Sequence, residues 1–161
     1  MASMGANEPN EPEAPNEPQA PQVLHAPQGP KAYAGAGITV TYDAGRCLHA
    51  ARCVGGLPEV FDSGRRPWIR PDGAAPERVA EVVRRCPSGA LQYRTAAGPA
   101  EQGDRPTSVV RSPLGQLFLR GELSVTTAAG GLRRETRAVL CACGVSGNQP
   151  YCDHSGACGK E

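Results

Sequence analysis

The chain has 161 residues, a formal net charge of +1 at pH 7 and only 4% aromatic residues. Without the four glutamates of residues 1–30 the rest of the chain carries +5, which is mildly basic, but the absence of a basic stripe interleaved with aromatic residues argues against a nucleic-acid partner. No segment is apolar over the length of a bilayer, so we expect no membrane span or membrane partner. Because so few large apolar residues are present, each small unit needs another source of stability, such as a metal.

The first 30 residues predict a disordered tail. They repeat Pro, Glu, Asn and Gln and contain few residues that could be buried. Such a composition favours an extended, polyproline-like chain over a packed domain. We interpret it as a spacer, with a partner-binding arm as the alternative. Two small units are expected after it, at residues 31–97 and 105–161, with a linker over 98–104.

The first unit, residues 31–97, has the pattern of a small α/β domain. Residues 38–42 alternate in polarity, which predicts a strand that is buried on one face. Residues 76–86 place three valines and Cys86 on one helical face, with a proline near each end of the segment. We therefore expect Cys86 to point inward and a second strand to begin near Leu91.

The second unit, residues 105–161, is predicted to be rich in β-structure. Short apolar alternations surround Gly121, where a bulge is expected, and the glycine pair at 130–131 suits a hairpin turn. The next strand would deliver Cys141 and Cys143 to a loop. Because side chains alternate along an extended chain, these two thiols can face the same way and bind one metal.

The seven cysteines fall into two groups, and their odd number argues against a closed disulfide framework. The tail also lacks the basic and apolar regions of a secretion signal. A reducing cytoplasm, where thiols stay free to bind metal, is therefore the expected location. The first group is Cys47, Cys53 and Cys86, and the second is Cys141, Cys143, Cys152 and Cys158.

Two segments of the first unit resemble the divergent mono-cluster 4Fe-4S domains related to bacterial ferredoxins. Cys86-Pro-Ser-Gly-Ala-Leu91 is similar to the segment that carries the last cluster ligand, where a Cys-Pro ends a helix. Cys47-Leu-His-Ala-Ala-Arg-Cys53 supplies the outer two cysteines of the C-x2-C-x2-C ligand motif. Ala50 stands in place of the middle cysteine, so three thiolates remain.

The resemblance implies a cluster bound by Cys47, Cys53 and Cys86. Three thiolates can hold a [3Fe–4S] cluster, or a [4Fe–4S] cluster whose last iron is bound by His49, water or another group. His49 lies beside the vacant ligand position, and its alternative role is a hydrogen bond to sulfide or to a carboxylate. Any one cysteine alone would be read as a small buried hydrophobe, but the joint pattern favours ligands.

The stretch from Cys141 to Gly156 resembles the CDGSH iron–sulfur domain of the mitoNEET type. Its spacing, C-x-C-x2-S-x3-P-x-C-D-x-S, matches that family up to the closing histidine, where this chain has Gly156. The resemblance implies a [2Fe–2S] cluster with Cys141 and Cys143 on one iron and Cys152 on the other.

Two residues near Gly156 are candidates for the missing ligand. His154 would retain a shell of three cysteines and one histidine, whereas Cys158 would give an all-thiolate shell. A histidine ligand raises the potential and makes it respond to pH, and a fourth thiolate predicts a lower potential and less acid lability. Tetrahedral zinc is the alternative to iron–sulfur here. The matching serine, proline and aspartate favour iron–sulfur.

The sequence thus predicts an α+β protein, with a ferredoxin-like α/β domain followed by a β-rich CDGSH-type domain. The predicted function is one-electron transfer, or redox sensing and cluster transfer, with unidentified redox partner proteins. No P-loop, G-x-G-x-x-G or nucleophile elbow occurs, so we do not expect an enzyme. The alternatives are a zinc-stapled or redox-switched interaction module and a non-catalytic oxidoreductase subunit. A homodimer stays open, because CDGSH proteins with one site are often dimers.

Overall fold

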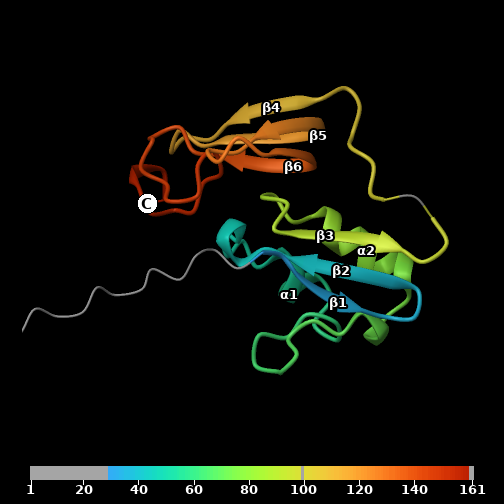
Figure 1. Ribbon diagram of the computed structural model, residues 1–161. Coiled ribbons are helices and arrows are strands. Elements are labelled where there is room, and N and C mark those ends of the chain that lie inside the picture. Colours follow the sequence, from blue (N-terminus) through green and yellow to red (C-terminus); the bar gives the residue numbers. More distant parts are fainter. Residues whose placement is uncertain (1–28, 99, 160–161) are drawn as a thin grey trace, which may run out of the picture.

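The computed structural model describes residues 29–98 and 100–159. Two three-stranded antiparallel sheets lie in these ranges, one from each half of the chain, and they occupy separate layers in Figure 1. The predicted disordered tail, residues 1–30, falls almost wholly outside the described residues and stays a prediction. No helix in the part of the chain described is long and apolar enough to cross a membrane.

The first sheet has the strand order β1–β2–β3, formed by Lys31–Ala34, Ile38–Tyr42 and Leu91–Thr95. The central strand β2 carries the predicted alternation, and its Ile38 and Val40 are buried. Apolar side chains on one face of a sheet need a second layer to cover them. The helix α2 packs against β3 and supplies that layer.

Helix α2 spans Pro76–Arg84 and buries Val79, Ala80, Val82 and Val83. Pro76 suits the first helical turn, because the N–H that proline lacks would have no partner inside the helix. The shorter elements of this half are α1 (Arg52–Gly56) and the 3-10 turns η1 (Ala44–Arg46) and η2 (Pro71–Gly73). As predicted, Cys86 follows the helix and packs against the hydrophobic core between the first sheet and α2, although its side chain is only half-buried.

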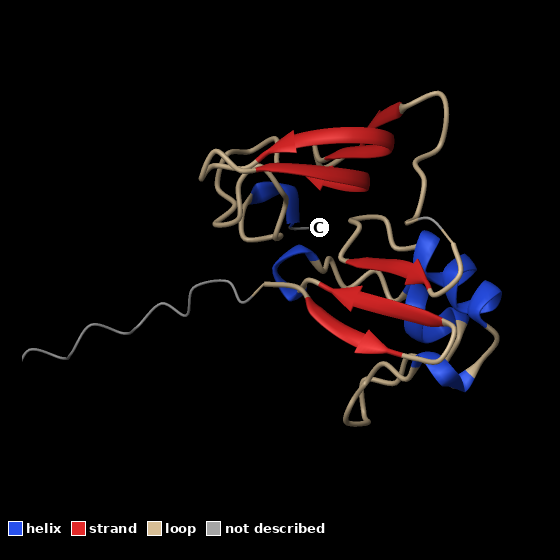
Figure 2. Cartoon of the chain, turned by 45° about the vertical axis from the view of Figure 1, so that its right-hand side comes forward, coloured by secondary structure: helices blue, strands red, loops and turns tan. Residues whose placement is uncertain are grey.

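The second sheet has the order β4–β5–β6, formed by Ser108–Arg111, Leu117–Thr126 and Leu132–Leu140. The pairing of β5 with β6 shifts between Arg120 and Leu123, and Gly121 there has φ of 140°. This is the predicted bulge. A loop and the 3-10 turn η3 (Ala157–Gly159) follow β6 and lie on the side of the sheet that faces the first half (Figure 2).

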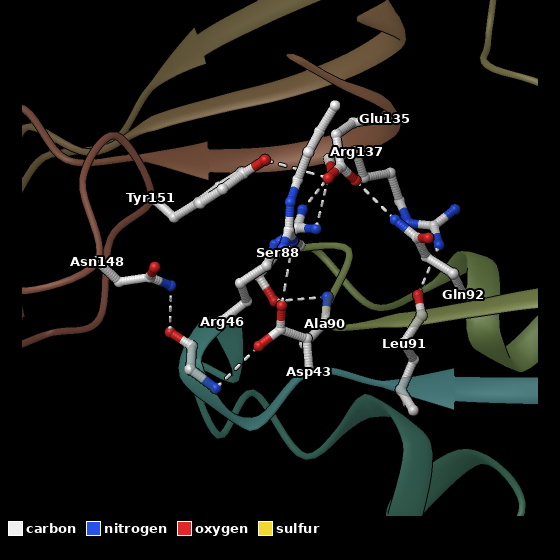
Figure 3. Close-up of polar contacts among 12 residues, drawn as sticks. Asp43, Arg46, Ser88, Ala90, Leu91, Gln92, Glu135, Arg137, Asn148 and Tyr151 are labelled. Atoms are coloured by element: carbon white, nitrogen blue, oxygen red, sulfur yellow. Dashed lines mark hydrogen bonds and ion pairs between the residues drawn. The ribbon is translucent and has the colours of Figure 1, made fainter. Parts of the chain in front are cut away.

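The two halves meet at a buried polar interface centred on Arg46. Its guanidinium donates to Glu135 Oε1 at 2.8 Å and to the carbonyl oxygens of Ser88 and Arg137 at 2.8 and 3.1 Å (Figure 3). It also lies 4.3 Å from the ring centroid of Tyr151, whose hydroxyl donates to Glu135 at 3.1 Å. Buried charges are tolerated when they are paired and hydrogen-bonded, as here. The network therefore defines how the halves pack together.

Further contacts extend this interface on both sides. Gln92 donates to the second carboxylate oxygen of Glu135 at 2.6 Å, and Arg137 donates to the carbonyl of Leu91 at 3.0 Å. Asn148, in the loop after β6, donates to the carbonyl of Gly45 at 3.0 Å. The loop of the second half is thus tied directly to the η1 turn that precedes Cys47.

Candidate metal centres

The first candidate centre is a small cavity of about 30 Å³ lined by Cys47, Cys53 and Cys86. The three cysteines come from separate places, because Cys47 follows η1, Cys53 lies in α1 and Cys86 follows α2. Tyr42 and Trp68, which pack edge to face, line the same cavity. The structure therefore places all three predicted ligands of the first half around one cavity, but among the described residues only thiols of the second half form a trio within 4.8 Å of one another.

The loop between Cys47 and Cys53 has an uncommon backbone. His49 and Ala51 have φ of 53° and 55°, a left-handed conformation that residues with a Cβ rarely adopt. Ala50 and Ala51 line the cavity, whereas His49 lines an open groove beside it. Ala50, which stands in place of the middle cysteine, therefore lines the cavity with its methyl group, and His49 lies next to it.

The first cavity is chemically suited to a cationic group. Burial raises the pKa of the Cys53 thiol, and the neighbouring thiols of Cys86 and Cys47 raise it further. Burial likewise raises the pKa of Tyr42, with a contribution from its hydrogen bond with Cys47. Ionising the Cys53 thiol therefore requires a nearby positive charge, and a bound metal deprotonates a thiol that ligates it. The donor set fits an iron–sulfur cluster.

The second candidate centre is a group of four thiols in the loop after β6. The Sγ atoms of Cys141 and Cys143 lie 3.5 Å apart, those of Cys143 and Cys158 3.3 Å, and those of Cys152 and Cys158 3.4 Å. Cys152 and Cys158 are 1% and 2% exposed. The sulfurs of Cys141, Cys143 and Cys158 all lie within 4.8 Å of one another. His154 lies outside that trio.

The loop returns to the end of β6 through backbone pairing. The amide of Cys141 donates to the carbonyl of Pro150 at 2.9 Å, and the amide of Cys152 donates to the carbonyl of Val139 at 2.9 Å. These bonds bring Cys152 back beside Cys141. Within the loop, Ser146 Oγ donates to the carbonyl of Tyr151 at 2.6 Å.

Asp153 holds the other side of this loop together. Its carboxylate accepts from the amides of Gly147 and Ser155, each at 2.9 Å. Burial alone would raise the pKa of Asp153, but these bonds and that of the Ser155 hydroxyl outweigh it and lower the pKa. The serine and aspartate of the CDGSH-like pattern therefore shape the loop that carries the thiols.

The four thiols of the second centre differ in their electrostatic surroundings. Backbone N–H groups of Cys158 and Val145, together with the Cys158 thiol, lower the pKa of Cys143 to about 6. Burial, with the neighbouring thiols Cys143 and Cys152, raises the pKa of Cys158 to about 12. The Cys143 thiolate is thus stabilised by amide donors, whereas ionising Cys158 requires a cation in the group. This donor set fits a thiophilic metal.

The two centres are linked by residues that flank Cys47. Leu48 packs against the apolar cluster of Val139, Cys152 and Cys158. Arg46, on the other side of Cys47, lies over the ring of Tyr151, the residue before Cys152. Direct neighbours of a candidate ligand in the first half therefore contact the ligand segment of the second.

A small α/β unit with three cysteines around one cavity is the arrangement expected of a ferredoxin-type, cluster-binding domain. The model of a family described as divergent 4Fe-4S mono-cluster matches residues 33–96. The chain is also 41% identical over 66 residues to Uncharacterized protein YjdI of Escherichia coli, in strains K12 and O157:H7. That alignment covers 41% of this chain and 87% of YjdI.

The chain belongs to the divergent 4Fe-4S mono-cluster family, which confirms the predicted resemblance of the first half. Its first half is accordingly an iron–sulfur cluster-binding domain of the 4Fe-4S type. No solved structure shows significant similarity to the chain. The family match ends at residue 96, before the second sheet begins. The CDGSH-type resemblance, with its [2Fe–2S] cluster, lies beyond the match and stays a prediction.

Proposed function

We propose that the protein is a two-centre iron–sulfur protein that transfers single electrons between redox partner proteins. The first centre is a [4Fe–4S]-type cluster held by Cys47, Cys53 and Cys86. The second is a [2Fe–2S] cluster in the thiol group of the loop after β6. When bound, each cluster supplies a metal site that accepts and releases one electron, and the protein tunes its potential through charge and burial.

The observation that carries this proposal is the contact of Leu48 with the apolar cluster around Cys152 and Cys158. Leu48 is bonded to Cys47, a ligand of the first centre, so packed atoms form a continuous path between the ligand shells. The buried Arg46–Glu135 pair holds the path in one geometry. Two centres coupled in this way suit a relay better than two independent cluster carriers.

Zinc is the second candidate for the thiol group of the second half. With zinc–sulfur bonds of about 2.3 Å, thiolates at the corners of a tetrahedron lie about 3.8 Å apart. The observed contacts of 3.3 to 3.5 Å resemble that compact arrangement. In this case zinc stabilises the fold of the second half, which serves as a protein-interaction module. Electron transfer is then confined to the first centre.

Metal analysis of the full chain purified without oxygen tests the proposal. We expect iron, acid-labile sulfide and two distinct sets of electron paramagnetic resonance signals on reduction. Cys86→Ser should abolish the first set and spare the second, and Cys152→Ser should do the reverse, because each removes a ligand from one centre only. Zinc with a single set of signals would establish the second candidate instead. A protein that retains neither iron nor sulfide would refute both centres.

A further inference from the structure

The Cys158 side chain occupies the centre of the thiol group in the second half. Its Sγ lies 3.3 Å from that of Cys143 and 3.4 Å from that of Cys152. It also lies within 4.8 Å of the sulfur of Cys141. A side chain that is 2% exposed and surrounded by three other thiols has the position expected of a metal ligand.

Gly156 supplies no side chain at the position of the family histidine, so the last ligand has to come from another residue. A Cβ built on Gly156 would lie 2.5 Å from the Cys143 sulfur and 2.8 Å from the Cβ of Val145. The backbone therefore passes directly against the thiols, and no side chain fits at the position of the family histidine. His154 has φ of 62°, is half-buried and lies outside the close thiol trio.

We infer that Cys158 is the fourth ligand of the second centre, so that this centre is held by four thiolates with no histidine. The inference rests on the proposed metal centre of the second half, and it specifies the ligand class as a soft, thiophilic metal or an iron–sulfur cluster. Relative to a shell with one histidine, four thiolates add negative charge, which lowers the reduction potential of a cluster.

The test compares Cys158→Ala with His154→Ala in the full chain, purified without oxygen. We expect Cys158→Ala to lose the metal of the second centre while the signals of the first centre remain. His154→Ala should retain both, and Cys158→Ser, which preserves the size of the side chain, should shift or weaken the second signal. Electron spin-echo measurements on the second-centre signal of the reduced wild type should show no nitrogen coupling of a bound imidazole.

The outcomes separate this inference from the proposed function. Metal retained unchanged in Cys158→Ala, or lost in His154→Ala together with imidazole coupling in the wild type, would overturn the assignment of Cys158 alone. Wild-type protein that carries only the first-centre signals, and no zinc, would remove the second centre itself. Survival of the first-centre signals in Cys158→Ala shows that the chain has folded.

Discussion

Replacing Glu135 with Gln is expected to lower the free energy of unfolding by roughly 3–5 kcal/mol. The change leaves the Arg46 guanidinium without its counter-charge in a site where both side chains are 3% exposed. It also weakens the acceptor for the Tyr151 hydroxyl and the Gln92 amide. Removing one partner of a buried pair is costly, because the remaining charge is desolvated without compensation. Urea denaturation of the metal-loaded full chain measures the effect.

The matched control is Glu122→Gln, which removes the partner of Arg105 in an exposed pair whose side chains are 76% and 58% accessible. Exposed pairs are screened by water and contribute little to stability, so this variant should unfold near the wild-type midpoint. The double variant Arg46→Met with Glu135→Leu should recover much of the lost stability, since apolar replacement of a buried pair is often neutral. Equal midpoints for Glu135→Gln and Glu122→Gln would show that the interface network does not stabilise the fold.

The position of this network gives it a functional role in the proposed relay. Arg46 immediately precedes Cys47, and Tyr151 immediately precedes Cys152, so one buried contact lies next to a candidate ligand in each half. Leu48 completes the connection from the other side of Cys47. A change that loosens the interface should therefore affect communication between the centres as well as stability.

Local patterns predicted much of the fold because they depend on near neighbours. The alternation in 38–42 and the proline-bounded helix over 76–84 are properties of short segments, and both are present. The glycine at 121 likewise marked the bulge. The spacing of Cys141 and Cys143 predicted that their thiols lie together, since residues i and i+2 of an extended chain share a face. Their sulfurs are 3.5 Å apart.

The interface could not be predicted from the sequence, because its partners are far apart along the chain. Arg46 and Glu135 are separated by 89 residues, and nothing near either one indicates that its charge is buried. Glu135 and Arg137 sit two apart on β6, a spacing equally typical of a solvent-facing strand. Similarly, His154 and Cys158 were both open as ligands until the return of the loop placed only Cys158 among the thiols.

Gly89→Ala is expected to destabilise the protein by roughly 2–5 kcal/mol, from backbone strain and overpacking together. Gly89 has φ of 66°, and a Cβ there would lie 2.4 Å from the carbonyl oxygen of Arg137 and 2.9 Å from the Arg46 guanidinium. Because Arg137 belongs to β6, relief of this clash requires the second half to move away from the first. The loss should appear in urea denaturation and as faster amide exchange in β6.

Gly130→Ala is the control that separates strain from contact. Gly130 also has a positive φ, of 79°, but an added Cβ would meet nothing within 4 Å. Its replacement should therefore cost only the left-handed conformation, about 1–2 kcal/mol. The excess loss in Gly89→Ala measures the close approach of the two halves. If the two variants lose the same stability, the backbone of residue 89 does not touch β6 in solution, and the two halves do not approach each other closely at this point.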